Sequence, residues 1–235
     1  MSSQPSVANG IVKQLIQAIG GANVVIDEVE RKLLSIDLSY KPGEIADVVV
    51  RPADSKEVST CVSIAASVGM PVVARGGGMS YTQGYQPEQP GSLLVDMRRM
   101  DQVLEINTED MYVTVQAGCT WKKLYEALLE HAVRTPYFGP LSGMYATVGG
   151  ALSQNSLFLG SGLYNTTAES ALGLKVILAD GAVLQTGSAA HKYGQPFYRH
   201  FGPDLTGIFT ADTGAFGIKS EATLRLIEAP EVTLF

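Results

Sequence analysis

The residues whose types and spacing suggest chemistry lie in the stretch PVVARGGGMSYTQGY, which covers residues 71–85. A short apolar run and Arg75 precede three consecutive glycines, Gly76 to Gly78. Where no Cβ atoms stand in the way, successive backbone N–H groups can approach one anion closely. The pattern therefore predicts a loop that binds a phosphate or pyrophosphate group.

Two common nucleotide-binding motifs do not fit this loop. A P-loop needs a lysine directly after its last glycine, and the chain has no lysine between Lys56 and Lys122. The dinucleotide fingerprint G-x-G-x-x-G needs glycine where Tyr81 stands, although Asp96 occupies the position of a ribose-binding carboxylate. The prolines and glycines of YTQGYQPEQPG also exclude the helix that this fingerprint opens. The remaining interpretation is a loop that binds pyrophosphate through its own backbone, without a following helix.

The elements that must position this loop follow from the hydrophobic period and from turn residues. The clearest helix is predicted at residues 53–69. Asp54 is its N-cap, Glu57 completes a capping box, and Gly69 closes the last turn. Further helices are predicted at residues 9–21 and 120–132, strands at 46–52, 71–75, 91–97, 103–106, 111–118 and 214–227, and a hairpin at 172–187.

A long segment without a clear period, residues 136–161, is rich in Gly, Ser and Pro, and it predicts a functional loop. Within the later hairpin, Asp180-Gly181 predicts a type I′ turn, because these residue types tolerate positive φ angles. These elements predict an α+β fold with two lobes, one over residues 1–118 and the other over residues 119–230.

The composition argues against several classes of protein. Charged residues make up 17% of the chain, the formal net charge is −6, and no basic run exceeds two residues. A surface for nucleic acid or an anionic membrane is therefore not expected. Cys61 and Cys119 lack metal-ligand spacing, so we predict buried free thiols and no metal site. The N-terminus lacks a signal-peptide pattern and no apolar run approaches about 18 residues, which favours a cytoplasmic location.

Several longer motifs follow one another in a characteristic order. The stretch VVVRPADSKEVSTCVSIAASVGMPVVARGGGMSYTQGY has a strand ending in RP, a helix, a strand and an R-G-x-G-x-S loop. After it come LLVDMRRM, VTVQAGCTWKKLYEAL, GPLSGMYATVGGALSQN and FGPDLTGIFTADTGAFGIKSEATLRL. Together, over residues 45–228, they resemble the FAD-binding domain of the vanillyl-alcohol oxidase / p-cresol methylhydroxylase flavoprotein superfamily. The branch nearest to it contains D-lactate dehydrogenases and the glycolate oxidase flavin subunit. The resemblance implies a small α/β lobe and a larger antiparallel-sheet lobe.

The resemblance also implies which residues contact FAD. For the pyrophosphate it implies backbone contacts from Arg75, Gly76, Gly77, Gly78, Met79 and Ser80. For the ribityl chain and the flavin ring it implies contacts from Pro140, Thr147, Gly149, Gly150, Ser153 and Asn155. Close approaches are also implied at Gly162 and, through its backbone, at Ile218. For each of the residues from Pro140 to Ile218, the alternative to a contact with FAD is a purely structural role in an ordinary turn.

The chain departs from the family pattern in two ways. Met79 stands where many relatives carry a histidine that bonds to the flavin, and no cysteine follows Cys119, so the resemblance implies non-covalent FAD. The chain also ends near the point where the family's substrate (cap) domain begins. Because it starts at Met1 and carries no tag, we expect one FAD-binding module, residues 1–235, whose partner chain supplies the cap. The alternative is a truncated piece of a longer protein.

Few side chains suggest a catalytic acid or base. His131, His191 and His200 are scattered, and each is predicted to be structural or solvent-facing. The segment HKYGQPFYRHFGPDLTG could form a rim near the flavin or contact a partner. Tyr145 and Tyr164 could donate hydrogen bonds to a substrate. No general base is identified.

The resemblance implies an FAD-dependent dehydrogenase or oxidase, as one subunit of a hetero-oligomer. Its substrate would be an alcohol, a 2-hydroxy acid or a benzylic compound that transfers hydride to the flavin. Two alternatives remain open. One is a non-catalytic FAD-binding or electron-relay module, and the other is a reductase of the UDP-N-acetylenolpyruvoylglucosamine type. The further domain and the catalytic residues that such a reductase needs are not recognisable in the sequence.

Overall fold

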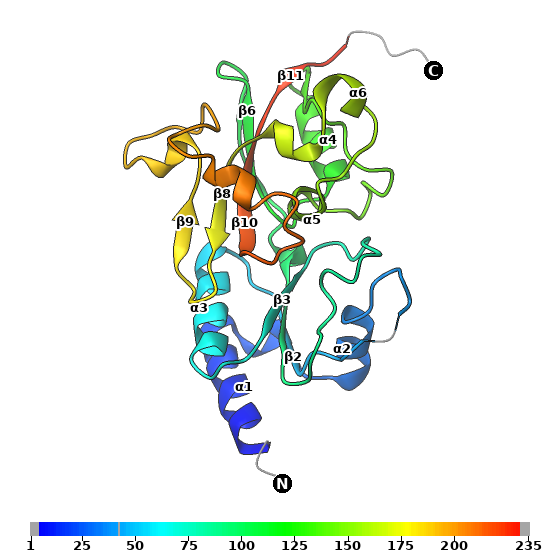
Figure 1. Cartoon of the computed structure of the whole chain (residues 1–235), viewed down its shortest axis with the longest axis vertical. Coiled ribbons are helices and arrows are strands. Elements are labelled where there is room, and N and C mark those ends of the chain that lie inside the picture. The colour runs from blue at the N-terminus through cyan, green and yellow to red at the C-terminus, as the bar shows by residue number, and fades with distance from the viewer. Residues whose placement is uncertain (1–4, 42, 231–235) are drawn as a thin grey trace.

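The computed structural model of the chain describes residues 5–41 and 43–230, and it places two lobes along one long axis (Figure 1). The helices are α1 (Pro5–Ile19), α2 (Glu28–Leu34), α3 (Ser55–Ala66), α4 (Trp121–Leu129), α5 (Val148–Gln154), α6 (Ser161–Tyr164) and α7 (Leu205–Ile208). The strands are β1 (Val24–Val25), β2 (Val48–Val50), β3 (Val72–Arg75), β4 (Leu93–Asp96), β5 (Val103–Asn107), β6 (Tyr112–Gln116), β7 (Val133–Arg134), β8 (Ala171–Ile177), β9 (Val183–Gln185), β10 (Ile218–Arg225) and β11 (Ile227–Glu228).

The smaller lobe is built on a four-stranded sheet of order β1-β2-β4-β3. Strands β2, β4 and β3 are parallel, so their carboxyl ends meet at one edge, where Arg75 lies opposite Asp96. Helix α3 connects β2 to β3 and begins where predicted, because the Asp54 side chain accepts from the Glu57 N–H at 2.8 Å. The Glu57 carboxylate accepts a hydrogen bond from the Ala53 N–H. A capping box would use the N–H of the N-cap residue Asp54 instead. The sheet edge therefore presents the glycine loop directly after β3.

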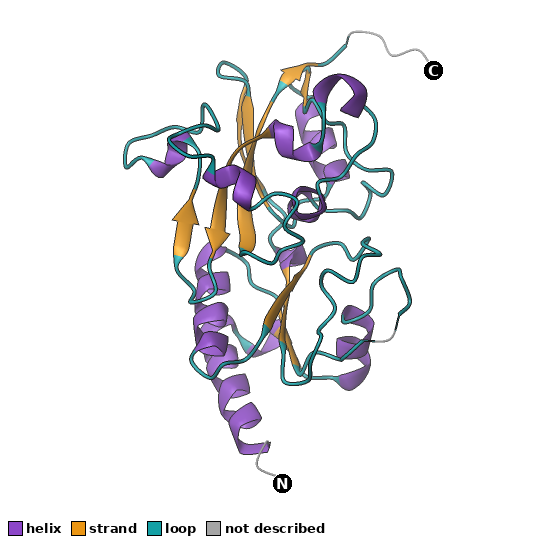
Figure 2. Cartoon of the chain, viewed as in Figure 1, coloured by secondary structure: helices purple, strands orange, loops and turns teal. Residues whose placement is uncertain are grey.

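The larger lobe is built on an antiparallel sheet of order β5-β6-β10-β8-β9 (Figure 2). Its core lies between this sheet and helices α4 and α5, with Trp121, Leu124 and Leu152 among the buried side chains. Strands β5 and β6 precede residue 118 but belong to this sheet. The chain therefore passes from the smaller sheet to the larger sheet between Asp96, where β4 ends, and Val103, where β5 begins. The predicted boundary at 118 is thus displaced, because β6 pairs with the distant β10.

Two local predictions differ from the structure. The segment 136–161 is not an irregular loop throughout, since it contains α5, whose Thr147 cap accepts from the Gly150 N–H. The hairpin turn is not type I′, because positive φ occurs at Gly181 but not at Asp180. Leu178 instead accepts from the Gly181 N–H at 2.9 Å and donates to Ala182 at 2.8 Å, which leaves Gly181 as a bulge.

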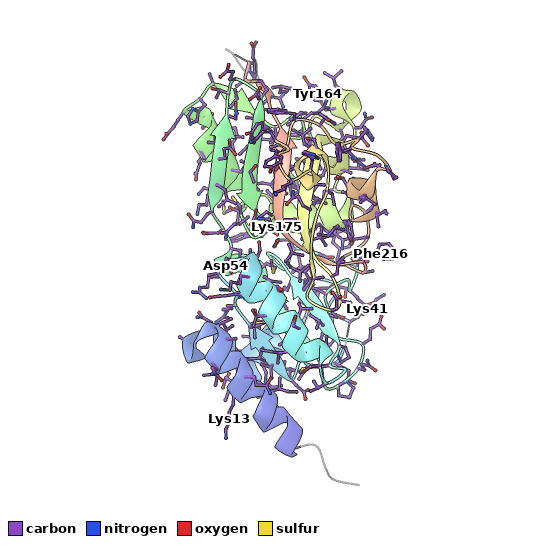
Figure 3. The ribbon with its side chains drawn as sticks, turned by 90° about the vertical axis from the view of Figure 1, so that its left-hand side faces the viewer. Lys13, Lys41, Asp54, Tyr164, Lys175 and Phe216 are labelled. Atoms are coloured by element: carbon purple, nitrogen blue, oxygen red, sulfur yellow. The ribbon has the colours of Figure 1, made fainter. Side chains whose placement is uncertain are left out.

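The hairpin turn joins the two lobes by resting on α3. The Ser59 hydroxyl donates to the Gly181 carbonyl at 2.6 Å, and the Ser63 hydroxyl donates to the Asp180 carbonyl at 3.1 Å. Figure 3 shows Asp54 at the end of α3 that lies against the larger lobe, where Ser55 donates to Glu221 at 2.8 Å. These bonds hold helix α3 of the smaller lobe against the hairpin turn and β10 of the larger lobe.

Candidate cofactor-binding site

A cavity of about 890 Å³ lies between the two lobes. Its lining combines the loop after β3, the N-terminal part of β10 and helix α5. Every residue that the family resemblance implies as an FAD contact lines this cavity, except Gly162. The structure therefore brings together two sets of residues that lie about seventy positions apart in the sequence (75–80 and 140–155).

The glycine loop offers free hydrogen-bond donors to the cavity. Within the described part of the chain, the backbone N–H groups of Gly77, Gly78, Met79 and Ser80 donate to no protein acceptor. Buried or half-buried N–H groups are normally paired, so four consecutive unpaired donors need a ligand or water. The Ser80 hydroxyl shares a hydrogen bond of 2.9 Å with Thr82. The loop is therefore suited to an anion with several acceptor oxygens.

The glycines of this loop are required by protein contacts as well as by a ligand. A Cβ atom at Gly76 would overlap the Thr147 hydroxyl, and one at Gly77 would overlap the Tyr145 carbonyl oxygen. Gly78 has a φ of +73°, and a Cβ there would meet the Arg75 guanidinium. The loop thus lies directly against the segment that enters α5, which closes one side of the cavity.

Arg75 places a cation at the base of the loop. It is only 9% exposed, its Nε has no hydrogen-bond partner, and its guanidinium lies 5.4 Å from the ring centre of Tyr85. Burial lowers the pKa of Arg75, although an arginine stays charged at neutral pH. A buried cation with an unused donor beside four free N–H groups matches a phosphate or pyrophosphate.

Asp96 is not available to a ligand. Its carboxylate accepts from Arg98 Nε at 2.8 Å and from Arg51 Nε at 3.3 Å, and the residue is fully buried. Burial alone would raise the pKa of Asp96, but the hydrogen bonds and charge of Arg98 outweigh it and hold the pKa below its usual range. No helix follows Gly78 before β4 in this described segment. The exclusion of the dinucleotide fingerprint is therefore confirmed.

Helix α5 contributes small side chains rather than amide donors. The Val148 N–H donates to Cys119 at 2.9 Å and the Gly149 N–H donates to Ala117 at 2.9 Å. The Gly150 N–H donates to the Thr147 cap at 3.3 Å. These groups already have partners, so Gly149 and Gly150 offer only a low surface along which a flat or extended ligand can lie.

Apart from Gly162, the remaining predicted contacts also line the cavity. Asn155 ends α5 with a φ of +47°, and its side chain accepts from the Ala168 N–H at 3.2 Å. The carbonyl oxygens of Pro140 and Ser153 accept bonds from Gly143 and Thr213. Ile218 is 8% exposed at the start of β10. These contacts hold the cavity wall in place without any ligand, so contact with FAD stays a prediction for each residue.

The sequence analysis missed two groups of lining residues. One is Lys219, which lines the cavity and whose ammonium lies 2.7 Å from the carboxylate of Asp212, a buried residue outside the lining. Burial lowers the pKa of Lys219, and the Asp212 carboxylate opposes that effect. The other group is an exposed apolar rim, formed by Tyr81, Leu141 and Leu157. The sequence did contain a sign of this ion pair, because a lysine within the apolar strand pattern at 214–227 needs a partner if it is buried.

Several predicted candidates are not among the residues that line the cavity. Among the described residues, its lining includes no histidine, and it includes neither Tyr145 nor Tyr164. The Tyr164 ring instead faces the Arg134 guanidinium at 5.6 Å from its centre. Cys61 and Cys119 are buried free thiols, as predicted. The described residues form no cluster of three metal-ligating side chains, and none of their helices is long and apolar enough to cross a membrane.

Gly162 offers a test that separates the family resemblance from the cavity geometry. It lies in α6, outside the cavity lining, and a Cβ atom there would meet nothing within 4 Å. We expect Gly162→Ala to leave the Kd for FAD within about twofold of the wild-type value. Fluorescence titration of the apoprotein measures this Kd. A tenfold weaker affinity would show that the resemblance, rather than the cavity lining, places Gly162 correctly.

Comparisons with known proteins agree with this site. The family model described as "FAD binding domain" matches residues 46–187. A glycolate oxidase subunit of Bacillus subtilis is 30% identical over 225 residues, which are 96% of this chain and 46% of that protein. A probable mitochondrial D-lactate dehydrogenase of Danio rerio is 30% identical over 230 residues, or 98% of this chain and 45% of that protein. The chain thus spans less than half the length of these relatives.

Solved structures share the fold over nearly the whole chain. A structure of p-cresol methylhydroxylase with bound substrate has a TM-score of 0.83 at 20% identity and covers 98% of this chain and 45% of that chain. 4-Ethylphenol oxidase from Gulosibacter chungangensis has a TM-score of 0.79 at 24% identity, with the same coverage. The predicted α+β fold of the p-cresol methylhydroxylase type is therefore confirmed. With its family match, its fold and its loop of free N–H groups, the chain belongs to the FAD-binding domain family of flavoproteins.

Proposed function

We propose that this chain is the FAD-binding part of a flavin-dependent dehydrogenase or oxidase. The observation that carries the proposal is the row of unpaired N–H groups from Gly77 to Ser80, beside the buried Arg75. The residues that carry these donors line a cavity of about 890 Å³, near the upper end of the range for small-molecule and cofactor sites, about 300–1,000 Å³. The residues present therefore fit a large ligand with a pyrophosphate group.

The loop and helix α5 would divide the work of holding this cofactor. The amides of Gly77 and Gly78 and the Arg75 guanidinium would bind the pyrophosphate, while Gly149 and Gly150 leave room for the extended chain beyond it. Bound FAD supplies the acceptor for the hydride that a substrate loses. Non-covalent binding is expected, because the Met79 thioether cannot form the bond that a histidine forms at this position.

The substrate class that we propose is an alcohol, with 2-hydroxy acids as the first candidates. Two relatives at 30% identity are named for glycolate and D-lactate, which are both 2-hydroxy acids. A benzylic substrate rests on fold likeness alone. No side chain of the cavity is proposed as a general base.

A further polypeptide is proposed to complete the substrate pocket, either as another domain or as a partner chain. The rim residues Tyr81, Leu141 and Leu157 are 74%, 85% and 67% exposed. Large apolar side chains gathered at a cavity mouth are typical of an interaction surface. The relatives, which are more than twice as long as this chain, contain additional chain that could cover such a rim.

The absorption spectrum of the purified protein tests the proposed function. We expect a yellow protein, or one that turns yellow with added FAD, whose flavin leaves with the supernatant after acid precipitation. Flavin that stays in the pellet would contradict non-covalent binding. A colourless protein that takes up no FAD would contradict the whole proposal.

Anaerobic bleaching of the flavin then separates an enzyme from a passive module. We expect a 2-hydroxy acid such as glycolate or D-lactate to bleach the flavin once the completing domain or partner is present. If dithionite bleaches the flavin but no hydroxy acid or alcohol does so in the completed assembly, the chain is an FAD-binding or electron-relay module.

The cytoplasmic location stays a prediction, and fractionation of the native cells measures it.

A further inference from the structure

Tyr85 lies where the glycine loop, residues 76–80, meets the segment before β2. It is 6% exposed, and its hydroxyl oxygen lies 3.1 Å from the carbonyl oxygens of both Ile36 and Gly78. Burial raises the pKa of Tyr85, so the hydroxyl keeps its proton at neutral pH and can donate it to either carbonyl. A single side chain thus connects the loop to a distant segment of the smaller lobe.

The hydrogen bond to Gly78 also determines the direction of a free N–H group. In a trans peptide, the C=O of one residue and the N–H of the next lie in one plane and point in opposite directions. A donor that holds the Gly78 carbonyl therefore fixes the direction of the Met79 N–H as well. Within the described part of the chain, that N–H donates to no protein acceptor, and Met79 lines the cavity.

The same arrangement recurs along the loop. Arg75 Nη1 donates to the Gly76 carbonyl at 3.2 Å, and the Leu38 N–H donates to the Ser80 carbonyl at 2.9 Å. Together with Gly78, every second carbonyl of the loop is therefore held by a protein donor. Fixing the direction of the neighbouring N–H groups in advance lowers the entropy that a ligand must give up on binding.

The ring of Tyr85 holds the cation of the site. The Arg75 guanidinium lies 5.4 Å from the ring centre, within the distance at which an aromatic face attracts a cation. The guanidinium also packs against Gly78, where a Cβ atom would overlap it. Because Arg75 Nε is buried without a hydrogen-bond partner, packing against the ring contributes to the position of this side chain.

Asp37 keeps the turn that carries Tyr85 in place. It is 2% exposed, and its carboxylate accepts from the Gln83 N–H at 2.6 Å and from Gln86 Nε2 at 3.2 Å. The Ser39 N–H is a third donor, at 2.9 Å. Hydrogen bonds to a carboxylate are stronger than those between neutral groups. Residues on both sides of Tyr85 are therefore tied to the segment before β2.

We propose that Tyr85 is a positioning residue for the anion-binding loop. Its hydroxyl sets the direction of the Met79 N–H by holding the Gly78 carbonyl, and its ring holds the Arg75 guanidinium beside the loop. A ligand with two adjacent phosphate groups then meets donors whose directions are already set. The inference rests on the proposed FAD-binding function and adds to it the residue that prepares the loop.

Tyr85→Phe tests the hydroxyl alone, because the ring and its contact with Arg75 stay. We expect the Kd for FAD to rise about tenfold, as for the loss of one hydrogen bond to a charged group. Fluorescence titration of the apoprotein measures this Kd.

Tyr112→Phe is a matched control for this substitution. Tyr112 is 2% exposed, its hydroxyl donates to Glu105 at 2.7 Å, and it does not line the cavity. Both variants remove one hydrogen-bonded hydroxyl from a buried tyrosine. We expect both to unfold at a lower temperature than the wild type, but Tyr112→Phe should bind FAD with wild-type affinity.

The amide signal of Met79 separates positioning from a general loss of stability. Labelling with ¹⁵N-methionine makes this signal visible by NMR, and Met79→Leu identifies it. We expect saturating FAD to shift its proton resonance downfield in the wild type, because the N–H then donates to a phosphate, and to shift it less in Tyr85→Phe. Met70, whose N–H donates to Ala65 at 2.9 Å outside the cavity lining, should keep its resonance in both proteins.

Distinct outcomes overturn distinct claims. Wild-type FAD affinity of Tyr85→Phe overturns the positioning role, and so does an equal loss of affinity in Tyr112→Phe. A Met79 resonance that FAD leaves unshifted in the wild type, or shifts equally in Tyr85→Phe, also overturns it. The wild-type spectrum decides even if Tyr85→Phe does not fold. A wild-type protein that binds no FAD would overturn the proposed function instead.

Discussion

Gly77→Ala is expected to lose at least about 100-fold in affinity for FAD, the largest effect that we expect from one methyl group. The added Cβ would overlap the Tyr145 carbonyl oxygen and lie 2.8 Å from its carbon and 3.3 Å from the Ala146 Cα. These are backbone atoms, which cannot turn aside as a side chain can. The loop must therefore move away from the segment before α5, and its N–H groups no longer converge.

The size of this effect follows from the number of bonds affected. Each hydrogen bond to a charged group contributes about 1.5–3 kcal/mol, and a loss of about 1.4 kcal/mol weakens binding tenfold. Misplacing two loop amides therefore predicts a loss of about 100-fold or more. Fluorescence titration of apoprotein with FAD measures it.

Gly10→Ala is the control for the added methyl group. Gly10 is exposed in α1, and a Cβ there would meet nothing within 4 Å. Its FAD affinity should equal that of the wild type. If Gly77→Ala also binds FAD as the wild type does, then the loop is not held against the Tyr145 segment when the cofactor binds.

Asp96→Ala is expected to lower the free energy of unfolding of the apoprotein by about 1.5–3 kcal/mol, because the buried carboxylate accepts hydrogen bonds from two arginines that are themselves partly exposed. The Asp96 side chain is 1% exposed and accepts from Arg98 at 2.6 Å and from Arg51 at 3.3 Å. Arg75, the strand partner of Asp96, also loses the favourable charge interaction that this carboxylate provides. Urea unfolding at pH 7 measures the loss. Glu126→Gln, which breaks an exposed pair with Lys122, should cost less than about 1 kcal/mol.

The pH dependence of Asp96→Asn gives an independent check with a definite sign. The folded pKa of Asp96 lies below the unfolded value of about 3.9. The contribution of its charge is therefore complete above the unfolded pKa and is lost as pH falls through the folded pKa. The difference in unfolding free energy between wild type and Asp96→Asn should be constant from pH 7 to about pH 5 and shrink below about pH 4. A difference that stays constant at low pH would contradict the assignment.

Local sequence signals were sufficient for the elements around the glycine loop. The cap of α3 at Asp54, the strands on both sides of α3 and the absence of a helix after Gly78 all depend on neighbouring residues. Helix α5 was missed for the same reason, because Gly149 and Gly150 weaken its local helical signal. It forms because Val148 and Leu152 are buried against the larger sheet, and that contribution comes from tertiary packing.

The sequence by itself determined the family, the FAD cofactor and the glycine loop that we propose as its binding site, because ordered motifs and glycine runs are local features. The tertiary structure alone decided what the glycines touch, since the Tyr145 carbonyl meets Gly77 only after both lobes have packed. It also decided that Asp96 is held by arginines, and that Lys219 meets Asp212 beside the cavity. Contacts of this kind join segments whose distance in space depends on every element between them. A pattern of residue types does not contain that distance.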